Sequence, residues 1–192
     1  METDLEWTFK SIADHSCKMC ELYKTAQLPC LTGVGPQSAR VAIFGEGPGI
    51  REDEIRRPFS GKAGHKLDEW LKQVGLNRMD LFIDNVTRCL PGDVEVTEKH
   101  TQACSHYTEL TLKSMPNLEY ILCLGAPASK QLMGLSGQIT KKHGTIVVKD
   151  SITYMATLHP AFVLRQPSWE PYVLADFQKF TQLVKGLGYP KP

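Results

Sequence analysis

The chain has 192 residues, of which 42% are hydrophobic and 22% charged, and its formal net charge is +1. These values are ordinary for a soluble globular protein, so we expect residues 1–192 to form one domain with a substantial core. They exclude a protein that grips a long stretch of nucleic-acid backbone, because such proteins carry a marked basic excess. Any nucleic-acid contact must be small and local.

The sequence shows no sign of membrane insertion or secretion. Its longest apolar runs, 41–44 and 120–124, are far too short to span a bilayer. The first ten residues, METDLEWTFK, are acidic and lack the apolar stretch of a secretory signal. We therefore expect an intracellular protein with no membrane partner.

The first half of the chain alternates helical and strand patterns. Residues 6–24 have a helical pattern, and 41–44 form a short apolar run that leads into glycines, as a buried parallel strand does. Helical spacing over 63–74 stops at Gly75, and a second strand at 81–84 leads into Asn85. Thr97 is a candidate N-cap for a helix that extends to about residue 115.

The second half continues the alternation. It predicts a strand at 120–124, a short helix at 128–133, paired strands at 145–148 and 152–157, and an amphipathic helix at 173–184. We therefore predict an α/β fold, a three-layer α/β/α sandwich with a mostly parallel central sheet. Ligands of such sheets bind at the carboxyl ends of the strands. Residues 45–49, Asn85 and His159 all follow predicted strands.

Six cysteines in an intracellular protein indicate metal or redox chemistry rather than disulfides. Two form a C-x2-C pair, and two more stand far downstream: Cys17, Cys20, Cys89 and Cys104. Unrelated thiols are the less favoured reading, and the spacing favours an iron–sulfur cluster over zinc only weakly. Cys123 lies in an apolar run as a small buried hydrophobe. Cys30 follows a proline in a loop and is an alternative ligand.

A glycine-rich segment, Gly-Glu-Gly-Pro-Gly at 45–49, follows the first strand. It is not a dinucleotide fingerprint, because Ile50 stands where the third glycine belongs. Gly61-Lys62 is not a phosphate-binding loop either, because Ala63 stands where Ser or Thr is needed. Two readings stay open: a turn whose backbone approaches a small planar ligand, with Glu46 projecting from it, or a simple strand-exit turn.

Several segments taken together resemble the family-4 uracil-DNA glycosylases, the iron–sulfur branch. These are Gly45–Gly49 with Glu52-Asp53, Arg57-Pro58-Phe59-Ser60-Gly61-Lys62-Ala63-Gly64, Asn85-Val86-Thr87-Arg88-Cys89, Leu124-Gly125-Ala126 and His159-Pro160-Ala161-Phe162-Val163-Leu164-Arg165. The resemblance extends from Cys17 to Phe180. It implies a monomer, cytoplasmic or nucleoid-associated, that removes uracil from single- or double-stranded DNA and leaves an abasic site. It also implies a 4Fe-4S cluster held by Cys17, Cys20, Cys89 and Cys104.

The resemblance also implies roles for individual residues. Phe59 would stack on the extruded base and Asn85 would read one edge of it, while the backbone at Gly45 and Gly47 approaches the base. His159 would donate a hydrogen bond to the departing uracil oxygen. Glu46 would position the attacking water or complement the charge on the sugar.

The contacts with DNA are expected to be local. The segment Pro160–Arg165 is predicted to be a loop pressed into the duplex, with Pro160 and Ala161 filling the gap and Arg165 near phosphate. Lys62 is a second candidate phosphate contact.

The sequence departs from the family pattern at a few positions. Ser60 and His65 replace the usual valine and glutamine near Phe59, so a glycosylase for another modified pyrimidine stays open. Leu90 stands where a basic residue usually follows the cysteine. The stretch from Asn85 to Cys104 lacks the basic insertion of the branch that traps DNA covalently, which predicts ordinary turnover. A non-enzymatic iron–sulfur DNA-binding module is the alternative from another class.

Overall fold

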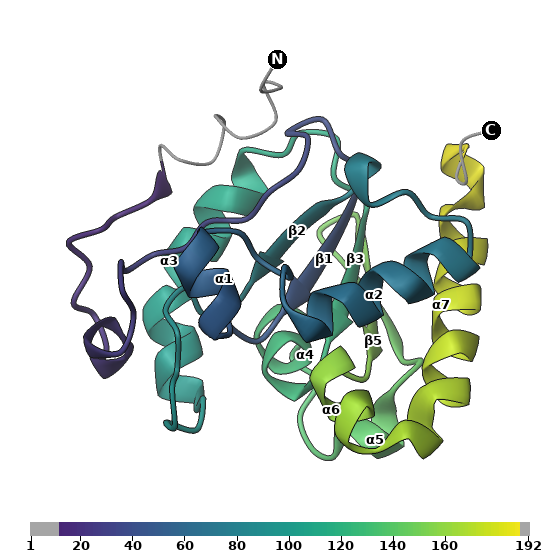
Figure 1. Ribbon diagram of the computed structural model, residues 1–192. Helices are drawn as coiled ribbons and strands as arrows, with labels where there is room; N and C mark the ends of the chain where they lie inside the picture. The colour runs from purple at the N-terminus through teal and green to yellow at the C-terminus, as the bar shows by residue number, and fades with distance from the viewer. Residues whose placement is uncertain (1–11, 189–192) are drawn as a thin grey trace.

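The computed structural model describes residues 12–188, and its centre is a five-stranded sheet (Figure 1). The strand order is β2 (Phe82–Asn85), β1 (Val41–Gly45), β3 (Tyr120–Leu124), β5 (Ile152–Thr157) and β4 (Ile146–Lys149). The first four strands are parallel, and β4 pairs antiparallel to β5 at the edge. The mostly parallel sheet predicted from the sequence is therefore confirmed, and every predicted strand is present.

Helices cover both faces of the sheet, which gives the predicted three layers. Their bounds are α1 Ile50–Ile55, α2 Lys62–Gln73, α3 Glu98–Lys113, α4 Ala126–Met133, α5 Ile139–Lys142, α6 Pro160–Arg165 and α7 Glu170–Val184. Short 3-10 turns lie at Glu21–Lys24 (η3), Arg78–Asp80 (η4), Pro167–Trp169 (η5) and Lys185–Leu187 (η6). Figure 1 shows α7 on one side of the sheet and α3 on the other.

Each face of the sheet has its own apolar core. One cluster joins Ile43 and Leu122 to Trp70 of α2 and Phe177 of α7. The other cluster lies on the opposite face of the sheet and joins Phe44 of β1 to Leu112 of α3 and Leu132 of α4. Because β1 and β3 lie in the middle of the sheet and are buried on both sides, their sequences are continuously apolar rather than alternating.

The predicted N-cap of α3 is confirmed. The Thr97 side chain caps the first turn, while the backbone N–H of Thr97 donates to Nδ1 of His100 at 3.0 Å. Reciprocal capping of this kind satisfies two backbone donors that the helix itself leaves free. It fixes the start of the helix that carries Cys104. Among residues 12–188, no helix is long and apolar enough to cross a membrane.

The helix predicted over residues 6–24 is wrong where the structure describes it. Residues 13–20 have no regular helix, and only the single turn η3 follows; residues 6–11 lie outside the described part. The Asp14 carboxylate accepts hydrogen bonds from the backbone N–H and the hydroxyl of Ser16, at 2.9 and 2.6 Å. Such local bonds favour a turn over a helix.

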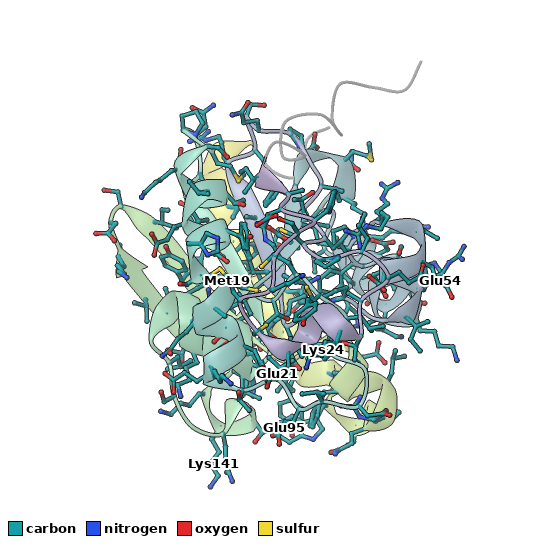
Figure 2. All side chains as sticks on the ribbon, turned by 90° about the vertical axis from the view of Figure 1, so that its left-hand side faces the viewer. Met19, Glu21, Lys24, Glu54, Glu95 and Lys141 are labelled. Carbon is teal, nitrogen blue, oxygen red and sulfur yellow. The ribbon has the colours of Figure 1, made fainter. Side chains whose placement is uncertain are left out.

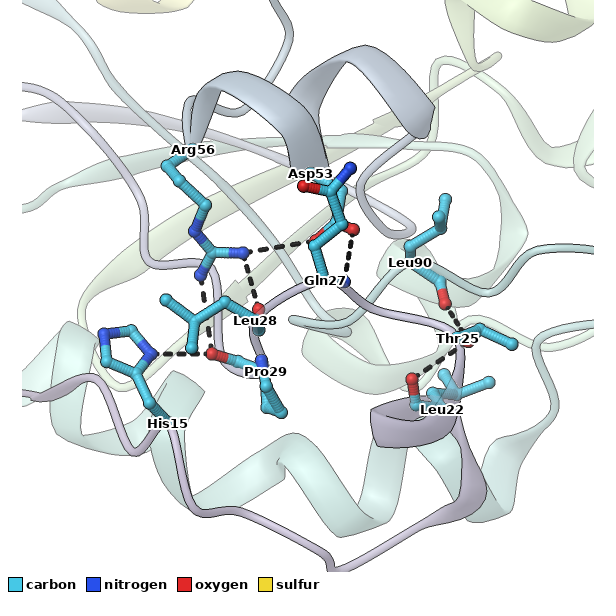
Figure 3. A network of polar contacts seen from close by, with 9 residues as sticks. All are labelled: His15, Leu22, Thr25, Gln27, Leu28, Pro29, Asp53, Arg56 and Leu90. Atoms are coloured by element: carbon cyan, nitrogen blue, oxygen red, sulfur yellow. Dashed lines mark hydrogen bonds and ion pairs between the residues drawn. The ribbon is translucent and has the colours of Figure 1, made fainter.

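Residues 13–30 instead form an extended segment on the surface, here called the strap. Met19, Glu21 and Lys24 lie on the face that Figure 2 shows, and Met19, between the two cysteines of the C-x2-C pair, is 59% exposed. Side chains from the body of the protein hold the strap (Figure 3). Asp53 accepts from the backbone N–H of Gln27 at 2.7 Å, and Arg56 donates to the carbonyls of Leu28 and Pro29.

The segment Pro160–Arg165 is the helix α6, not the loop expected from the sequence. His159 caps it, since its Nδ1 accepts from the backbone N–H of Ala161, and Pro160 occupies the first turn. Proline is favoured there because its missing N–H would have no partner in the helix anyway. The helix is only six residues long, which explains why no periodic pattern revealed it.

Candidate active site

A cavity of about 820 Å³ lies where β1, β2 and β5 end. Five residues predicted to bind the base or to act on it line this cavity: Glu46, Gly47, Phe59, Asn85 and His159. Three of the predicted DNA contacts line it as well: Lys62, Ala161 and Arg165. The other two predicted residues do not line the cavity: Gly45 is the last residue of β1, and Pro160 is buried in the first turn of α6. The sheet thus brings together residues that are up to 119 positions apart in sequence.

Phe59 forms one wall of the cavity in an unusual backbone conformation. It is 4% exposed, its φ is +52°, and its ring centroid lies 5.7 Å from that of His159. A bulky residue with positive φ is costly unless its surroundings fix it. Here the Glu52 carboxylate accepts from the backbone N–H groups of Ser60 and Gly61, at 3.1 and 2.8 Å. The sequence predicts no role for Glu52, because its burial and the backbone groups that it reaches are seen only in the structure.

Gly45 is needed because two side chains approach its backbone. In the parallel register Gly45 is opposite Asn85. A Cβ at position 45 would lie 2.4 Å from Cζ of Phe59 and 2.6 Å from Oδ1 of Asn85. Any other residue would therefore displace the ring or the amide. The requirement is steric, which a single sequence does not reveal.

The amide oxygen of Asn85 lies at the cavity without a hydrogen-bond partner in the described part of the chain. Asn85 is 3% exposed, and its Oδ1 is buried without a hydrogen-bond partner among the residues that the structure describes. An acceptor left unpaired in a buried position costs about 1–3 kcal/mol. The cost disappears when a planar molecule with a suitable N–H enters the cavity.

Glu46 lies between the backbone turn and the rim. Thr87 fixes the turn, because its backbone N–H and hydroxyl donate to the Glu46 carbonyl at 2.9 and 2.8 Å. Burial raises the pKa of the Glu46 carboxyl; Arg165 opposes that shift and Glu95 adds to it. The acid is therefore sensitive to charges at the mouth of the cavity.

His159 is a neutral hydrogen-bond donor. Its Nδ1 accepts from the backbone N–H of Ala161 at 3.2 Å, so in the neutral ring the proton is on Nε2. Nε2 is buried and has no partner within residues 12–188. Burial, helped by Arg165, lowers the pKa of His159 to about 4. The imidazole is thus uncharged near neutral pH and presents one unpaired N–H.

The four cysteines predicted to be ligands gather where the strap meets β2 and α3. Cys17 and Cys20 are half-buried, whereas Cys89 and Cys104 are buried. Burial raises the pKa of Cys89 to about 11 and that of Cys104 to about 12, and the Cys20 sulfur adds to both shifts. The Cys20 sulfur is therefore close enough to Cys89 and Cys104 to affect the pKa of both thiols. No group of three or more His, Cys, Asp or Glu side chains in the described part is already arranged around a metal position.

The remaining cysteines differ from each other. Cys123 is fully buried in β3, as expected for a small hydrophobe, and burial raises the pKa of its thiol. Cys30 is 1% exposed with φ of +60°. It lies beside Arg88, whose charge lowers the pKa of the Cys30 thiol against the larger effect of burial. Cys30 therefore belongs to the surroundings of the four-cysteine site.

Ser60 and His65 are the departures from the family pattern that keep another modified pyrimidine possible as the substrate. Their side chains do not face the cavity. Among the described residues that line it, neither Ser60 nor His65 is present. The Ser60 hydroxyl donates to the Arg57 carbonyl at 2.8 Å, and His65 is exposed on α2. Ser60 nevertheless stands between Phe59 and Gly61, which both line the cavity, so an effect of Ser60 and His65 on base preference stays a prediction.

Comparison with known proteins agrees with this architecture. The family model of the uracil DNA glycosylase superfamily matches residues 32–185. The Type-4 uracil-DNA glycosylase of Archaeoglobus fulgidus is 33% identical over 178 residues, which cover 88% of each chain. That of Thermotoga maritima is 33% identical over 177 residues, 90% of this chain and 91% of the relative. The relative from Sulfurisphaera tokodaii is 34% identical over 181 residues, 88% of this chain and 80% of its own.

The chain therefore belongs to the uracil-DNA glycosylase superfamily and, within it, to the type-4 family. The resemblance inferred from the motifs is confirmed.

Proposed function

We infer that this protein is a uracil-DNA glycosylase, an enzyme of base excision repair that hydrolyses the N-glycosidic bond of uracil in DNA. One observation carries the inference: a single cavity contains two buried polar atoms without partners in the described part of the chain, Oδ1 of Asn85 and Nε2 of His159. One is an acceptor and the other a donor. The names of the type-4 relatives supply the reaction class.

We propose that Asn85 selects the base. Uracil presents an N–H donor at N3 beside a carbonyl acceptor at O4, and a side-chain amide offers the complementary acceptor and donor. Cytosine presents an acceptor at N3 and an amino group at C4, so the same amide in the same orientation would meet it with two repulsive contacts. Phe59 would stack on the base after it has been extruded from the helix.

His159 and Glu46 are the proposed catalytic residues. When the bond between C1′ and N1 breaks, its electron pair stays with uracil, and negative charge develops on O2. The N–H at Nε2 of His159 would stabilise that charge without donating its proton, because the ring is neutral to begin with. A water then adds to C1′, with Glu46 orienting it and accepting its proton.

The proposed DNA contacts surround the cavity. Lys62 and Arg165 are exposed at the cavity and would contact phosphate, and Ala161 of α6 lies on the rim with Pro160 behind it. Extrusion of the uracil leaves a gap that the exposed end of α6 is suited to fill, because Leu164 there is 43% exposed. With so few cationic contacts, the affinity for DNA should be modest and fall only gently with salt.

We propose that Cys17, Cys20, Cys89 and Cys104 hold a 4Fe-4S cluster. The four thiols suit iron, and the buried guanidinium of Arg88 beside them has two nitrogens, Nε and Nη1, without partners in residues 12–188. Such donors complement the negative charge of a thiolate-bound cluster. When bound, the cluster would cross-link the strap to β2 and α3, with no part in bond cleavage. We also propose that the chain acts as an intracellular, single-domain monomer.

The test is removal of uracil from a synthetic oligonucleotide that contains one uracil, followed by alkaline cleavage at abasic sites. Wild-type protein should cleave this strand and leave the matching cytosine strand intact. Asn85→Ala should abolish most of the activity, whereas Asn77→Ala, an exposed asparagine outside the cavity, should not change it. Folded, brown protein that forms no abasic sites would refute the proposal and favour a binding module.

A further inference from the structure

A buried ion pair connects the four-cysteine site to the base-reading side of the cavity. Asp84 directly precedes Asn85, and Arg88 directly precedes Cys89. Both side chains are 1% exposed, and Nη2 of Arg88 lies 2.8 Å from Oδ2 of Asp84. Because side chains alternate along a strand, Asp84 points to the face of β2 opposite that of Asn85. The pair therefore lies behind the pocket wall and not in the pocket.

Asp84 uses both of its carboxylate oxygens as acceptors. Oδ1 accepts from the backbone N–H of Asn85 at 2.8 Å, while Oδ2 accepts from Arg88. Gly33 packs directly against this carboxylate, since a Cβ there would lie 2.8 Å from Cγ of Asp84. The carboxylate thus has little freedom to rotate, and it holds the peptide that presents the Asn85 amide.

Arg88 extends the connection to α3 and the cysteines. Its Nη2 also donates to Oγ1 of Thr111 at 2.6 Å and approaches the carbonyl of Tyr107 at 3.4 Å. Its backbone N–H lies near the thiol of Cys104 and its guanidinium near that of Cys30, since each lowers the pKa of the thiol beside it. The chain of contacts from the cysteine site to Asn85 therefore has two members, Arg88 and Asp84.

We propose that Asp84 and Arg88 are positioning residues that set the orientation of Asn85 from the four-cysteine site. The proposal rests on the proposed role of Asn85 as the residue that reads uracil. A buried ion pair contributes little net stability, because desolvation offsets most of the attraction between the charges. Its effect here is geometric: it fixes the end of β2 against α3.

The sharpest variant is Asp84→Asn, which has almost the same shape. An amide has only one acceptor oxygen, so its NH2 group must face either the N–H of Asn85 or the guanidinium of Arg88. The measurement is the inhibition constant of free uracil against uracil excision, with cluster absorbance recorded on the same sample. This constant does not depend on the fraction of active protein, so a merely structural role would not change it.

The chain contains a matched control. Asp53 is also 1% exposed, and its two oxygens accept from a backbone N–H (Gln27) and an arginine (Arg56), but it holds the strap and not the pocket (Figure 3). We expect Asp84→Asn to raise the inhibition constant about tenfold, the equivalent of one hydrogen bond. Asp53→Asn should lower the melting temperature and leave the constant unchanged.

A wild-type inhibition constant in folded, cluster-containing Asp84→Asn would overturn the proposal. If that variant cannot be purified in folded form, Arg88→Lys takes its place. Lysine keeps the charge, but its side chain is one bond shorter and brings no nitrogen to the position of Nη2, which donates to both Asp84 and Thr111. A wild-type constant there overturns the proposal equally. Failure of the proposed function looks different, because wild-type protein would then neither excise uracil nor respond to free uracil.

Discussion

The cavity and the four-cysteine site are positioned by different means. The groups of the cavity stand at the ends of neighbouring parallel strands, where backbone pairing sets their separation, as in the register of Gly45 with Asn85. The cysteine site combines a strap without regular structure, the end of a loop and one helix. Few backbone bonds join these parts, and side chains such as Asp53 and Arg56 hold the strap. The sheet therefore sets the positions of the cavity groups by backbone pairing, whereas side-chain hydrogen bonds, together with the proposed cluster, would hold the strap.

We therefore expect the residues of the cavity to carry out the reaction and the four-cysteine site to stabilise the fold. In the cavity, buried polar atoms such as Nε2 of His159 have no hydrogen-bond partner in the described part of the chain. Around the cysteines, burial raises the pKa values of Cys89 and Cys104, so binding of the proposed cluster would have to displace the thiol protons. Damage to the first region should reduce the rate, and damage to the second should reduce the amount of folded protein.

The largest effect is expected from His159→Ala. Loss of the N–H that faces the leaving uracil should reduce the single-turnover rate of excision about 10²–10³-fold, the usual cost of one such donor. Rapid-quench assays at saturating enzyme measure this rate. The exposed His65 outside the cavity is the control, and His65→Ala should match the wild type. A similar loss in both variants would contradict the position assigned to the catalytic donor.

Cys89→Ala should affect folding before chemistry. Loss of one ligand removes most of the free energy that metal binding adds to folding, on the order of several kcal/mol. We expect little soluble protein, and a rate per folded molecule within a few-fold of the wild type. Cys123→Ala, in the core of β3, should stay brown and soluble. Normal solubility of Cys89→Ala with lost activity would reverse the comparison.

The stability of the cavity region should depend on pH through His159. Its folded pKa, about 4, is below the ordinary value of 6.5, so the unfolded chain binds a proton more readily in this range. The stabilisation is therefore complete above pH 6.5 and decreases as the pH falls toward 4, by about 3 kcal/mol at most. Urea unfolding of the wild type and of His159→Gln from pH 4 to 7 measures the difference. Parallel pH profiles would contradict the neutral, buried imidazole.

The smallest effect concerns the rim charges and Glu46. The rate requires the Glu46 carboxylate, so it should decrease as the pH falls through the raised pKa of that group. Arg165 lowers this pKa and Glu95 raises it. Arg165→Gln should therefore move the acid limb of the single-turnover profile to higher pH and Glu95→Gln to lower pH, each by a few tenths of a unit. Shifts of the same sign would exclude Glu46 as the group that titrates.

The sequence predicted regular elements and strand-end groups well. Apolar runs revealed every strand and placed Asn85 and His159 at strand ends, while their proposed roles came from the resemblance to the family. The helix expected over residues 6–24 was wrong because tertiary bonds, such as the Tyr107 hydroxyl to Asp14 at 3.1 Å, outweigh helical spacing in a cysteine-rich strap. The roles of Glu52 and the Asp84–Arg88 pair needed coordinates, since they depend on which backbone groups a buried carboxylate reaches.

The most direct test of this division of roles follows the uracil excision rate while the cluster is removed stepwise by mild oxidation. Single-turnover rate, visible absorbance of the cluster and folded fraction by circular dichroism are recorded on each sample. We predict that the rate per folded molecule stays constant while cluster and folded fraction decrease together. A rate that falls in proportion to the cluster, in protein that stays folded, would contradict the account and assign the cysteine site a part in the reaction itself.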